Sequence, residues 1–133
     1  MDAKALMQAA QEARKHSHSP YSHFRVGAAL LTKGGKVYTG CNIENAAYSV
    51  TNCAERTAIF KAVSEGEREF SALAIVGGRE GETAELCAPC GVCRQAISEF
   101  CSKDFEIILG NEDKFAVYTL EQLLPLSFSD KDL

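Results

Sequence analysis

The sequence predicts one α/β domain in which helices cover a mixed sheet of five strands, a three-layer α/β/α arrangement. The helical and extended patterns follow one another in the order αββαβαββα, which is expected for helices layered on a mixed sheet. Residues 72–76 are wholly apolar, as in a strand that is covered on both faces. With 133 residues and 46% hydrophobic content, the chain fits a single domain spanning residues 1–133.

The N-terminal part predicts a helix followed by a β-hairpin. The helical pattern stops before Pro20, in a polar stretch. Residues 24–30 then alternate at the period of a strand, and residues 37–41 form the return strand. A tight turn at 33–36 joins the two strands. The apolar face of the helix consists of Leu6, Met7, Ala10 and Ala13.

The second helix begins in the stretch 51–58. A polar cap precedes it, and its apolar run ends at Gly66. Cys53 and Glu55 are therefore expected in the first turn, where unpaired backbone N–H groups favour a thiolate or a carboxylate. An alternative stays open, because Asn52 and Glu55 have the spacing of a capping box, in which Glu55 would only close the helix.

The C-terminal half predicts a buried strand, a helix, a second hairpin and a short final helix. Residues 77–89 are rich in glycine and glutamate and predict a loop. The next helix carries an apolar stripe from Cys93 to Phe100. The remaining elements are strands at 105–109 and 114–118 and a helix at 120–124, capped by Thr119.

Composition excludes several classes of protein. The formal charge of −4 argues against a nucleic-acid surface, which is usually strongly basic. No apolar stretch approaches the roughly 20 residues that a membrane span needs. The N-terminus shows no basic region followed by an apolar one, so we expect no secretory signal. The six cysteines are then expected to be cytoplasmic thiols or metal ligands rather than disulfides.

Cysteine spacing predicts a zinc site with an adjacent acid. Catalytic zinc takes three protein ligands and leaves its fourth position to water, which becomes a nucleophile near neutral pH. Glu55 is close enough in sequence to reach that water without binding the metal. Arg56 and Arg94 are placed to donate to the sulfurs and offset their negative charge. The expected ligands of one zinc ion are Cys53, Cys90 and Cys93.

Other interpretations of the polar residues remain. Cys90 with Cys93, or Cys87 with Cys90, has the spacing of a redox pair, and the preceding apolar strand would suit a thioredoxin-like unit. That interpretation leaves the Cys-x-Glu motif at 53–55 unexplained. Together with Pro-Cys-x-x-Cys at 89–93, this motif forms a zinc-deaminase signature in three-cysteine form. Histidines at 16, 18 and 23 indicate a polar turn before and after Pro20 more than a second metal site.

Over nearly its whole length the chain resembles the small, tetrameric type of cytidine deaminase. The string of four motifs is far more specific than any one of them. Ala88 departs from the serine usual before Pro-Cys, and Cys87 stays unassigned. The motifs that carry the resemblance are residues 20–30 (PYSHFRVGAAL), 40–48 (GCNIENAAY), 53–58 (CAERTA) and 89–95 (PCGVCRQ).

The resemblance implies roles for individual residues. Zinc would lie on the three cysteines named above, with Glu55 as proton shuttle. Asn42 and Glu44 would hold the ribose hydroxyls, the Ala54 N–H would meet the pyrimidine carbonyl, and Phe24 would pack against the base. By pattern alone Phe24 would be core, and Asn-x-Glu would be ordinary turn chemistry. The remaining substrate contacts are Ile43 and, serving a neighbouring subunit of a homotetramer, Ala46, Tyr48 and Phe128.

We therefore expect hydrolytic deamination of cytidine, and of 2′-deoxycytidine, in pyrimidine salvage. Water activated by zinc would attack ring carbon C4, while Glu55 moves protons to ring nitrogen N3 and to the departing amine. The partners expected are a small nucleoside and further copies of the chain, with no nucleic acid and no membrane. Three alternatives remain: a deaminase of another cytosine-like compound such as a nucleoside antibiotic, a thiol–disulfide protein, and a non-catalytic zinc-stabilised module.

Overall fold

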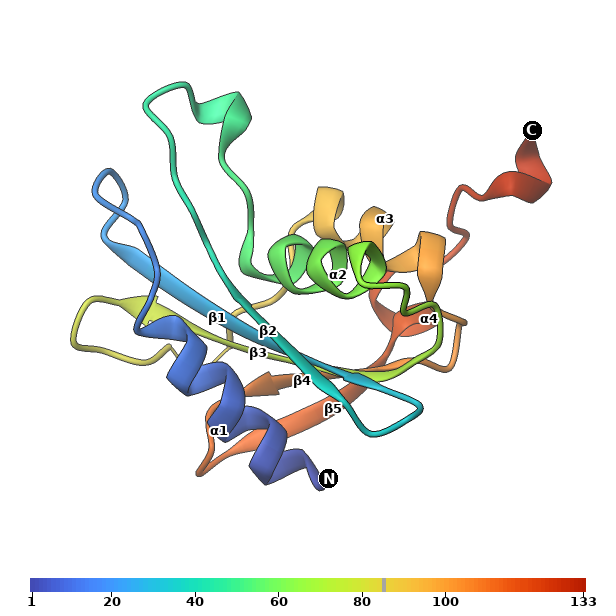
Figure 1. The fold of residues 1–133 in the computed structure, drawn as a ribbon, viewed down its shortest axis with the longest axis horizontal. Helices are drawn as coiled ribbons and strands as arrows, with labels where there is room; N and C mark the ends of the chain where they lie inside the picture. The colour runs from blue at the N-terminus through green and yellow to red at the C-terminus, as the bar shows by residue number, and fades with distance from the viewer. Residues whose placement is uncertain (85) are drawn as a thin grey trace.

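Residues 1–84 and 86–133, which the computed structural model describes, form helices and strands in the predicted order (Figure 1). The longest helix has 12 residues, and no helix in these ranges is long and apolar enough to cross a membrane. The helices are α1 (Ala3–Arg14), α2 (Ala54–Ser64), α3 (Gly91–Phe100) and α4 (Leu120–Leu123), with short 3-10 helices η1 (Tyr48–Val50) and η2 (Asp130–Asp132). The strands are β1 (Phe24–Thr32), β2 (Val37–Cys41), β3 (Phe70–Arg79), β4 (Glu106–Gly110) and β5 (Phe115–Thr119).

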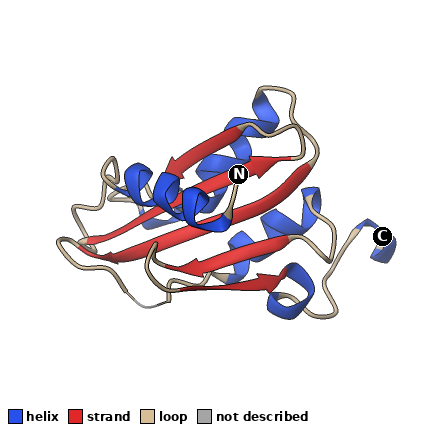
Figure 2. Cartoon of the chain, turned by 90° about the horizontal axis from the view of Figure 1, so that it is seen from below, coloured by secondary structure: helices blue, strands red, loops and turns tan. Residues whose placement is uncertain are grey.

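The strands form one sheet in the order β2-β1-β3-β4-β5 (Figure 2). β3 and β4 are parallel, because α3 lies between them in the chain and carries it back across the sheet. The other neighbouring strands are antiparallel. This mixed five-stranded sheet confirms the predicted fold class.

Helices cover both faces of the sheet, with α1 on one side and α2, α3 and α4 on the other (Figure 1). The central strand β3 shows why the run 72–76 is apolar throughout. Ala74 and Val76 pack in the cluster that contains α1, whereas Leu73 and Ile75 pack in the cluster that contains α2 and α3. Alternate residues of one strand therefore fill two separate apolar layers.

β3 continues beyond the predicted strand, to Arg79, so the first three residues of the predicted loop 77–89 are extended. Their partners explain the difference. Residues 77–79 pair with residues 24–26 of β1, so that the long antiparallel β1–β3 ladder extends past the apolar segment. Backbone pairing of this kind is independent of side-chain polarity, which is why the glycine-rich sequence concealed it.

Glycines let both helical layers approach the hairpin closely. A Cβ built on Gly27 would overlap the Ala10 carbonyl of α1. A Cβ on Gly40 would lie 2.6 Å from the carbonyl oxygen of Ala54 and 2.6 Å from the amide nitrogen of Ala58. Residue 40 must therefore lack a side chain for α2 to lie where it does, and α2 begins directly after Cys53.

Candidate active site

Cys53 and Glu55 lie at the N-terminus of α2, with Ala54 between them. The N-cap of α2 is Cys53, whose backbone is extended and whose side chain makes no capping hydrogen bond. Asn52 Nδ2 instead donates to Thr57 Oγ1 at 3.0 Å. The capping-box interpretation of Asn52 and Glu55 is therefore wrong, because the helix begins one residue later than that interpretation requires.

Three thiols meet where the N-termini of α2 and α3 approach each other. Cys90 is the N-cap of α3, and Cys93 lies in its first turn. The Sγ atoms of Cys53, Cys90 and Cys93 all lie within 4.8 Å of one another. Zinc–sulfur bonds of about 2.3 Å in tetrahedral geometry need sulfurs about 3.8 Å apart, so only small movements separate this cluster from a zinc site. The donor set fits zinc, as predicted.

The electrostatics of the cluster favour thiolates. A hydrogen bond from the Cys93 thiol, together with Arg56, lowers the pKa of Cys53 to about 5, although burial opposes this shift. The same hydrogen bond and burial raise the pKa of Cys93. One negative charge is thus already favoured among the sulfurs without any metal. A bound cation would favour deprotonation of the remaining thiols.

Arg56 supports the cluster as the sequence predicts. Its Nη2 donates to Cys53 Sγ at 3.4 Å, and this interaction raises the pKa of the guanidinium. Its Nε is buried and has no hydrogen-bond partner within the described ranges. The guanidinium therefore brings positive charge directly to a sulfur that would bind the metal.

Arg94 has different partners from those that the sequence suggests. Its Nε donates to the carbonyl of Pro89 at 2.7 Å, and its Nη1 donates to the carbonyl of Leu123 at 2.6 Å. The first bond reaches the residue before Cys90, and the second reaches the last residue of α4. Arg94 thus acts on the backbone around the ligand rather than on the sulfur, a long-range pairing that local sequence does not reveal.

Glu55 is a buried acid at the edge of the thiol cluster. Only 5% of its surface is exposed. Burial, reinforced by the nearby Cys53 thiolate, raises the pKa of Glu55 to about 7, although its own backbone amide and Cys93 act in the opposite direction. A carboxyl group with such a pKa can both give and accept a proton near neutral pH.

One cavity connects these groups. Its volume is about 360 Å³, within the size range of small-molecule sites. The predicted residues Phe24, Asn42, Glu44 and Ala54 line it, beside Cys53, Glu55 and Cys90. The remaining lining residues are Ser22, Val26, Thr51, Cys87 and Ala88. Val26 follows Phe24 by two residues on the same strand, so the alternation in β1 could have identified it.

Four predicted contacts do not line this cavity in the described residues: Ile43, Ala46, Tyr48 and Phe128. Tyr48 instead lines a neighbouring cavity of about 340 Å³, which shares Ser22, Glu44 and Thr51 with the first. Phe128 is 60% exposed and lies in the tail after α4. Ile43 pairs its backbone with Asn52, and its side chain is 47% exposed.

The polar wall of the cavity is ordered by backbone contacts. Glu44 accepts hydrogen bonds from the amides of Tyr21 and Ser22 at 3.1 Å each, and from the Ser22 hydroxyl. Burial raises the pKa of Glu44, but these hydrogen bonds outweigh it and lower the pKa overall. Asn42 is buried; its Oδ1 accepts from the Val26 amide at 2.9 Å and its Nδ2 donates to the Phe24 carbonyl at 2.8 Å.

Cys87 and the histidines take no part in the thiol cluster. Burial raises the pKa of Cys87 to about 11, and its sulfur lies against Gly77 of β3. Among the described residues, the cysteine triad is the one group of three or more potential ligands close enough to hold an ion.

Comparisons with known proteins agree with this geometry. Residues 1–109 match the family described as the cytidine and deoxycytidylate deaminase zinc-binding region. The cytidine deaminase of Sporosarcina psychrophila is 51% identical over 100% of this chain and 96% of its own. The crystal structure of cytidine deaminase from Burkholderia pseudomallei has a TM-score of 0.89 and 47% identity, covering 96% of this chain and 100% of that one. A blasticidin-S deaminase from Bacillus cereus is 35% identical over 78% of this chain and 76% of its own.

Proposed function

Because the chain belongs to the cytidine and deoxycytidylate deaminase family, we propose that it deaminates cytidine and 2′-deoxycytidine by zinc-dependent hydrolysis. The products are uridine or deoxyuridine and ammonia, a reaction that serves pyrimidine salvage in the cytoplasm. The observation that carries the proposal is a cluster of three thiols beside a buried acid, with Cys53, Cys90 and Glu55 lining one cavity of about 360 Å³. A thiol–disulfide protein would need neither the third thiol nor Glu55.

The metal and the acid divide the chemistry between them. When bound to Cys53, Cys90 and Cys93, zinc supplies a Lewis acid that activates water for attack on ring carbon C4. Glu55 takes a proton from this water and passes it to ring nitrogen N3. It then takes the proton of the hydroxyl group added at C4 and delivers it to the exocyclic amine, so that the C4–N bond breaks, the C4 carbonyl forms and ammonia leaves. Burial keeps the carboxyl group able to bind a proton at each stage.

The remaining lining residues hold the substrate. Ala54 is the first residue of α2, so its N–H has no acceptor within the helix and can donate to the pyrimidine carbonyl. Phe24 packs against the base. Glu44, held ionised by its hydrogen bonds, and the remaining N–H of Asn42 receive the ribose hydroxyls. Ile43 lies between these two residues in the sequence, and its contact with the substrate stays a prediction.

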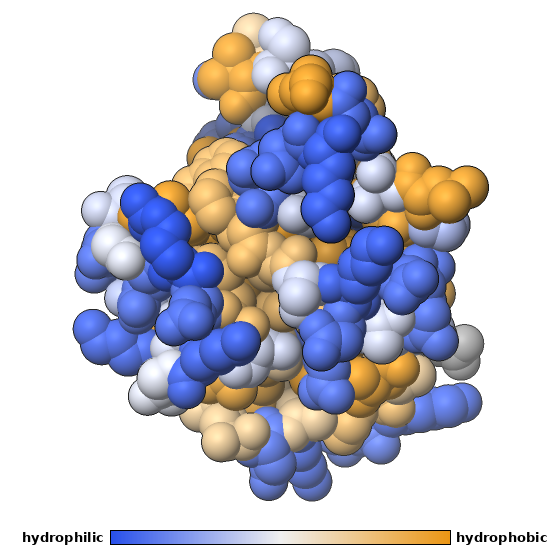
Figure 3. Space-filling model, turned by 90° about the vertical axis from the view of Figure 1, so that its right-hand side faces the viewer, coloured by the Kyte–Doolittle hydropathy of each residue, from blue (hydrophilic) through white to orange (hydrophobic). Residues whose placement is uncertain are grey.

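A homotetramer with shared sites accounts for the contacts that the single chain lacks. Tyr48 is 72% exposed and Phe128 is 60% exposed, and both are large hydrophobic side chains. The tail stands away from the body in Figure 1, and hydrophobic patches lie between hydrophilic residues on the face shown in Figure 3. We assign Ala46, Tyr48 and Phe128 to the site of a neighbouring subunit, where they exclude water from the substrate.

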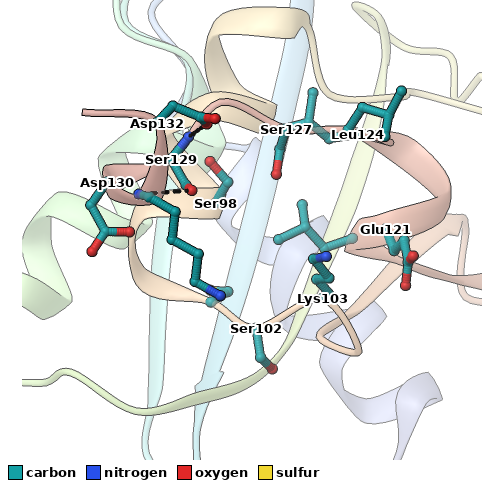
Figure 4. A pocket seen from close by; sticks show the side chains of 13 residues that line it. Ser98, Ser102, Lys103, Glu121, Leu124, Ser127, Ser129, Asp130 and Asp132 are labelled. Carbon is teal, nitrogen blue, oxygen red and sulfur yellow. Dashed lines mark hydrogen bonds between the residues drawn. The ribbon is translucent and has the colours of Figure 1, made fainter.

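The space beneath the tail supports the same assembly. A cavity of about 410 Å³ is lined by the tail residues Ser127, Ser129 and Asp130, by Ser98 of α3 and by residues of α4 (Figure 4). Within the described ranges, a single hydrogen bond, from Gln95 Nε2 to the Phe128 carbonyl at 3.1 Å, ties the tail to the rest of its own chain. A closed symmetric assembly offers apolar surface for such a segment to cover.

Loss of ultraviolet absorbance on adding cytidine to purified protein tests the function, with metal analysis in parallel. We expect turnover and one zinc per chain. A zinc-loaded protein without turnover would indicate a structural zinc module, and a zinc-free protein with a Cys90–Cys93 disulfide would indicate redox chemistry. The antibiotic alternative is tested with blasticidin S as a competing substrate. The blasticidin-S deaminase is 35% identical to this chain, whereas the cytidine deaminase of Sporosarcina psychrophila is 51% identical.

A further inference from the structure

Cys90 is the least supported of the three expected zinc ligands. It follows residues 86–89, which form no helix or strand, its side chain makes no capping hydrogen bond, and it is exposed. Cys93 in contrast is buried within the first turn of α3, and Cys53 begins α2. The position of Cys90 therefore depends on what holds the backbone around it.

Arg94 provides that hold. Its amide donates to the Cys90 carbonyl at 2.9 Å, as the first hydrogen bond of the helix. Its side chain folds back, and Nε donates to the carbonyl of the buried Pro89 at 2.7 Å. Arg94 therefore binds both the carbonyl before Cys90, which belongs to Pro89, and the carbonyl of Cys90 itself. An arginine can do this because its planar donors point in fixed directions.

The other end of the Arg94 side chain reaches the C-terminal part of the protein. Nη1 donates to the Leu123 carbonyl at 2.6 Å, which is free because it lies at the end of α4. α4 itself is fixed by a capping box between Thr119 and Gln122. Gln95, the next residue, donates to the Phe128 carbonyl of the tail at 3.1 Å. The first turn of α3 therefore ties the ligand segment to α4 and the tail.

We infer that Arg94 is a positioning residue, which keeps Cys90 in place for zinc by fastening the Pro89 carbonyl to the end of α4. The inference rests on the proposed zinc site but concerns how long the metal stays bound, not the reaction. Groups that orient metal ligands typically change metal affinity by about 10- to 100-fold when removed. The arginine acts through directed hydrogen bonds to backbone rather than through its charge on the sulfurs.

Zinc release from the loaded protein to an excess of a chromophoric chelator tests this inference. We expect Arg94→Gln to release zinc about tenfold faster than the unaltered protein. Arg94→Lys keeps the charge but cannot reach both carbonyls in fixed directions, so it should also release zinc several-fold faster. It serves as the second variant if Arg94→Gln does not fold.

Arg68→Gln is the matched control. Arg68 Nη1 also donates to two backbone carbonyls, of Val63 and Glu67 at 2.8 Å each, but far along the chain from the ligands. Its release rate should equal that of the unaltered protein. The inference would be overturned if Arg68→Gln released zinc as fast as Arg94→Gln does. It would also be overturned if Arg94→Lys released zinc at the rate of the unaltered protein, because the positive charge alone would then suffice. Unaltered protein without zinc would instead refute the proposed function.

Discussion

Glu55 owes its chemical properties to its burial and to its place two residues after a ligand thiol. Nearly all of its surface is covered, and the pKa of its carboxyl group is raised to about 7. A general acid–base group works best when its pKa is close to the working pH. Glu55 forms no capping box with Asn52, because the N-cap of α2 is Cys53.

Replacing this acid should separate catalysis from metal binding. In Glu55→Gln the shape and hydrogen-bonding capacity remain, but the amide cannot carry protons. We expect the turnover of cytidine to fall by about 10²–10⁴-fold or more, with zinc content and fold unchanged. Steady-state kinetics and metal analysis check this outcome. Turnover within about tenfold of the unaltered enzyme would remove Glu55 from the mechanism.

The six cysteines should divide into two sets of three. Alanine at position 53, 90 or 93 should abolish stoichiometric zinc, because a three-ligand site loses a third of its bonds to the metal. Alanine at 41, 87 or 101 should leave zinc in place, since those thiols lie outside the cluster. Elemental analysis of each purified variant decides the matter. A zinc-free Cys87→Ala protein would show that the ligands are assigned in the wrong register.

Residue chemistry was largely predictable from sequence, and the exceptions have a common cause. The spacing of Cys90 and Cys93, the acid two residues after Cys53 and the partner of Arg56 all depend on neighbours within one helical turn. The acceptors of Arg94 could not be predicted, because one of them lies 29 residues away at the end of another helix. The capping-box interpretation placed the N-cap of α2 at Asn52, one residue before the observed N-cap, Cys53. Asparagine is a preferred N-cap residue and cysteine is not.

At the level of elements, the site depends on how closely α2 lies against β2. Gly40 allows this approach, since a Cβ there would come within 2.6 Å of two backbone atoms of α2. Backbone cannot move aside as a flexible side chain can. The helix that begins at Cys53 would have to shift as a whole, and the ligand and Glu55 would shift with it.

Gly40→Ala should therefore impair both stability and catalysis. We expect a loss of about 1–3 kcal/mol in the free energy of unfolding, the usual cost of overpacking, and a lower kcat. Urea unfolding and kinetics measure the two effects. Gly34→Ala is the control, because its nearest neighbour would be 3.7 Å away, in the exposed hairpin turn. Normal activity in Gly40→Ala would mean that the helix tolerates displacement without disturbing the site.

The strands and helices themselves followed the sequence closely, apart from their ends. The apolar run at 72–76 correctly indicated a strand between two helical layers. The extension of β3 through Arg79 escaped prediction because its cause is pairing with β1, about fifty positions earlier in the chain. Local patterns specify which elements form, whereas contacts between distant segments set where they stop.

At the level of the whole molecule, some residues that were predicted to contact the substrate do not reach the active-site cavity of the single chain. Ala46, Tyr48 and Phe128 lie outside the cavity that holds Glu55. A homotetramer would bring these residues from a neighbour, and light scattering should give four times the mass of one 14.4 kDa chain. A fully active monomer would contradict the assembly.

Mixing two inactive variants should restore activity if the sites are shared. Phe128→Ala chains retain Glu55, and Glu55→Gln chains retain Phe128, so a mixed tetramer contains some sites with both residues intact. We expect partial recovery once exchange of subunits has been established, for example with one variant carrying a tag. No recovery after proven exchange would place Phe128 at the site of its own chain.

The meeting of three thiols from two helices also has a thermodynamic consequence. Cys53 and Cys90 lie on opposite sides of β3 in the sequence, so a metal bound to both closes a chain loop that contains the central strand. Such a cross-link is absent from the unfolded chain, and a ligand present at 1,000 times its dissociation constant adds about 4 kcal/mol of stability. Calorimetry should show the melting temperature rising with free zinc and falling under a chelator. A melting temperature that does not change with zinc would mean that folding and metal binding are uncoupled. If the two are coupled, the concentration of free zinc sets the thermal stability of this protein.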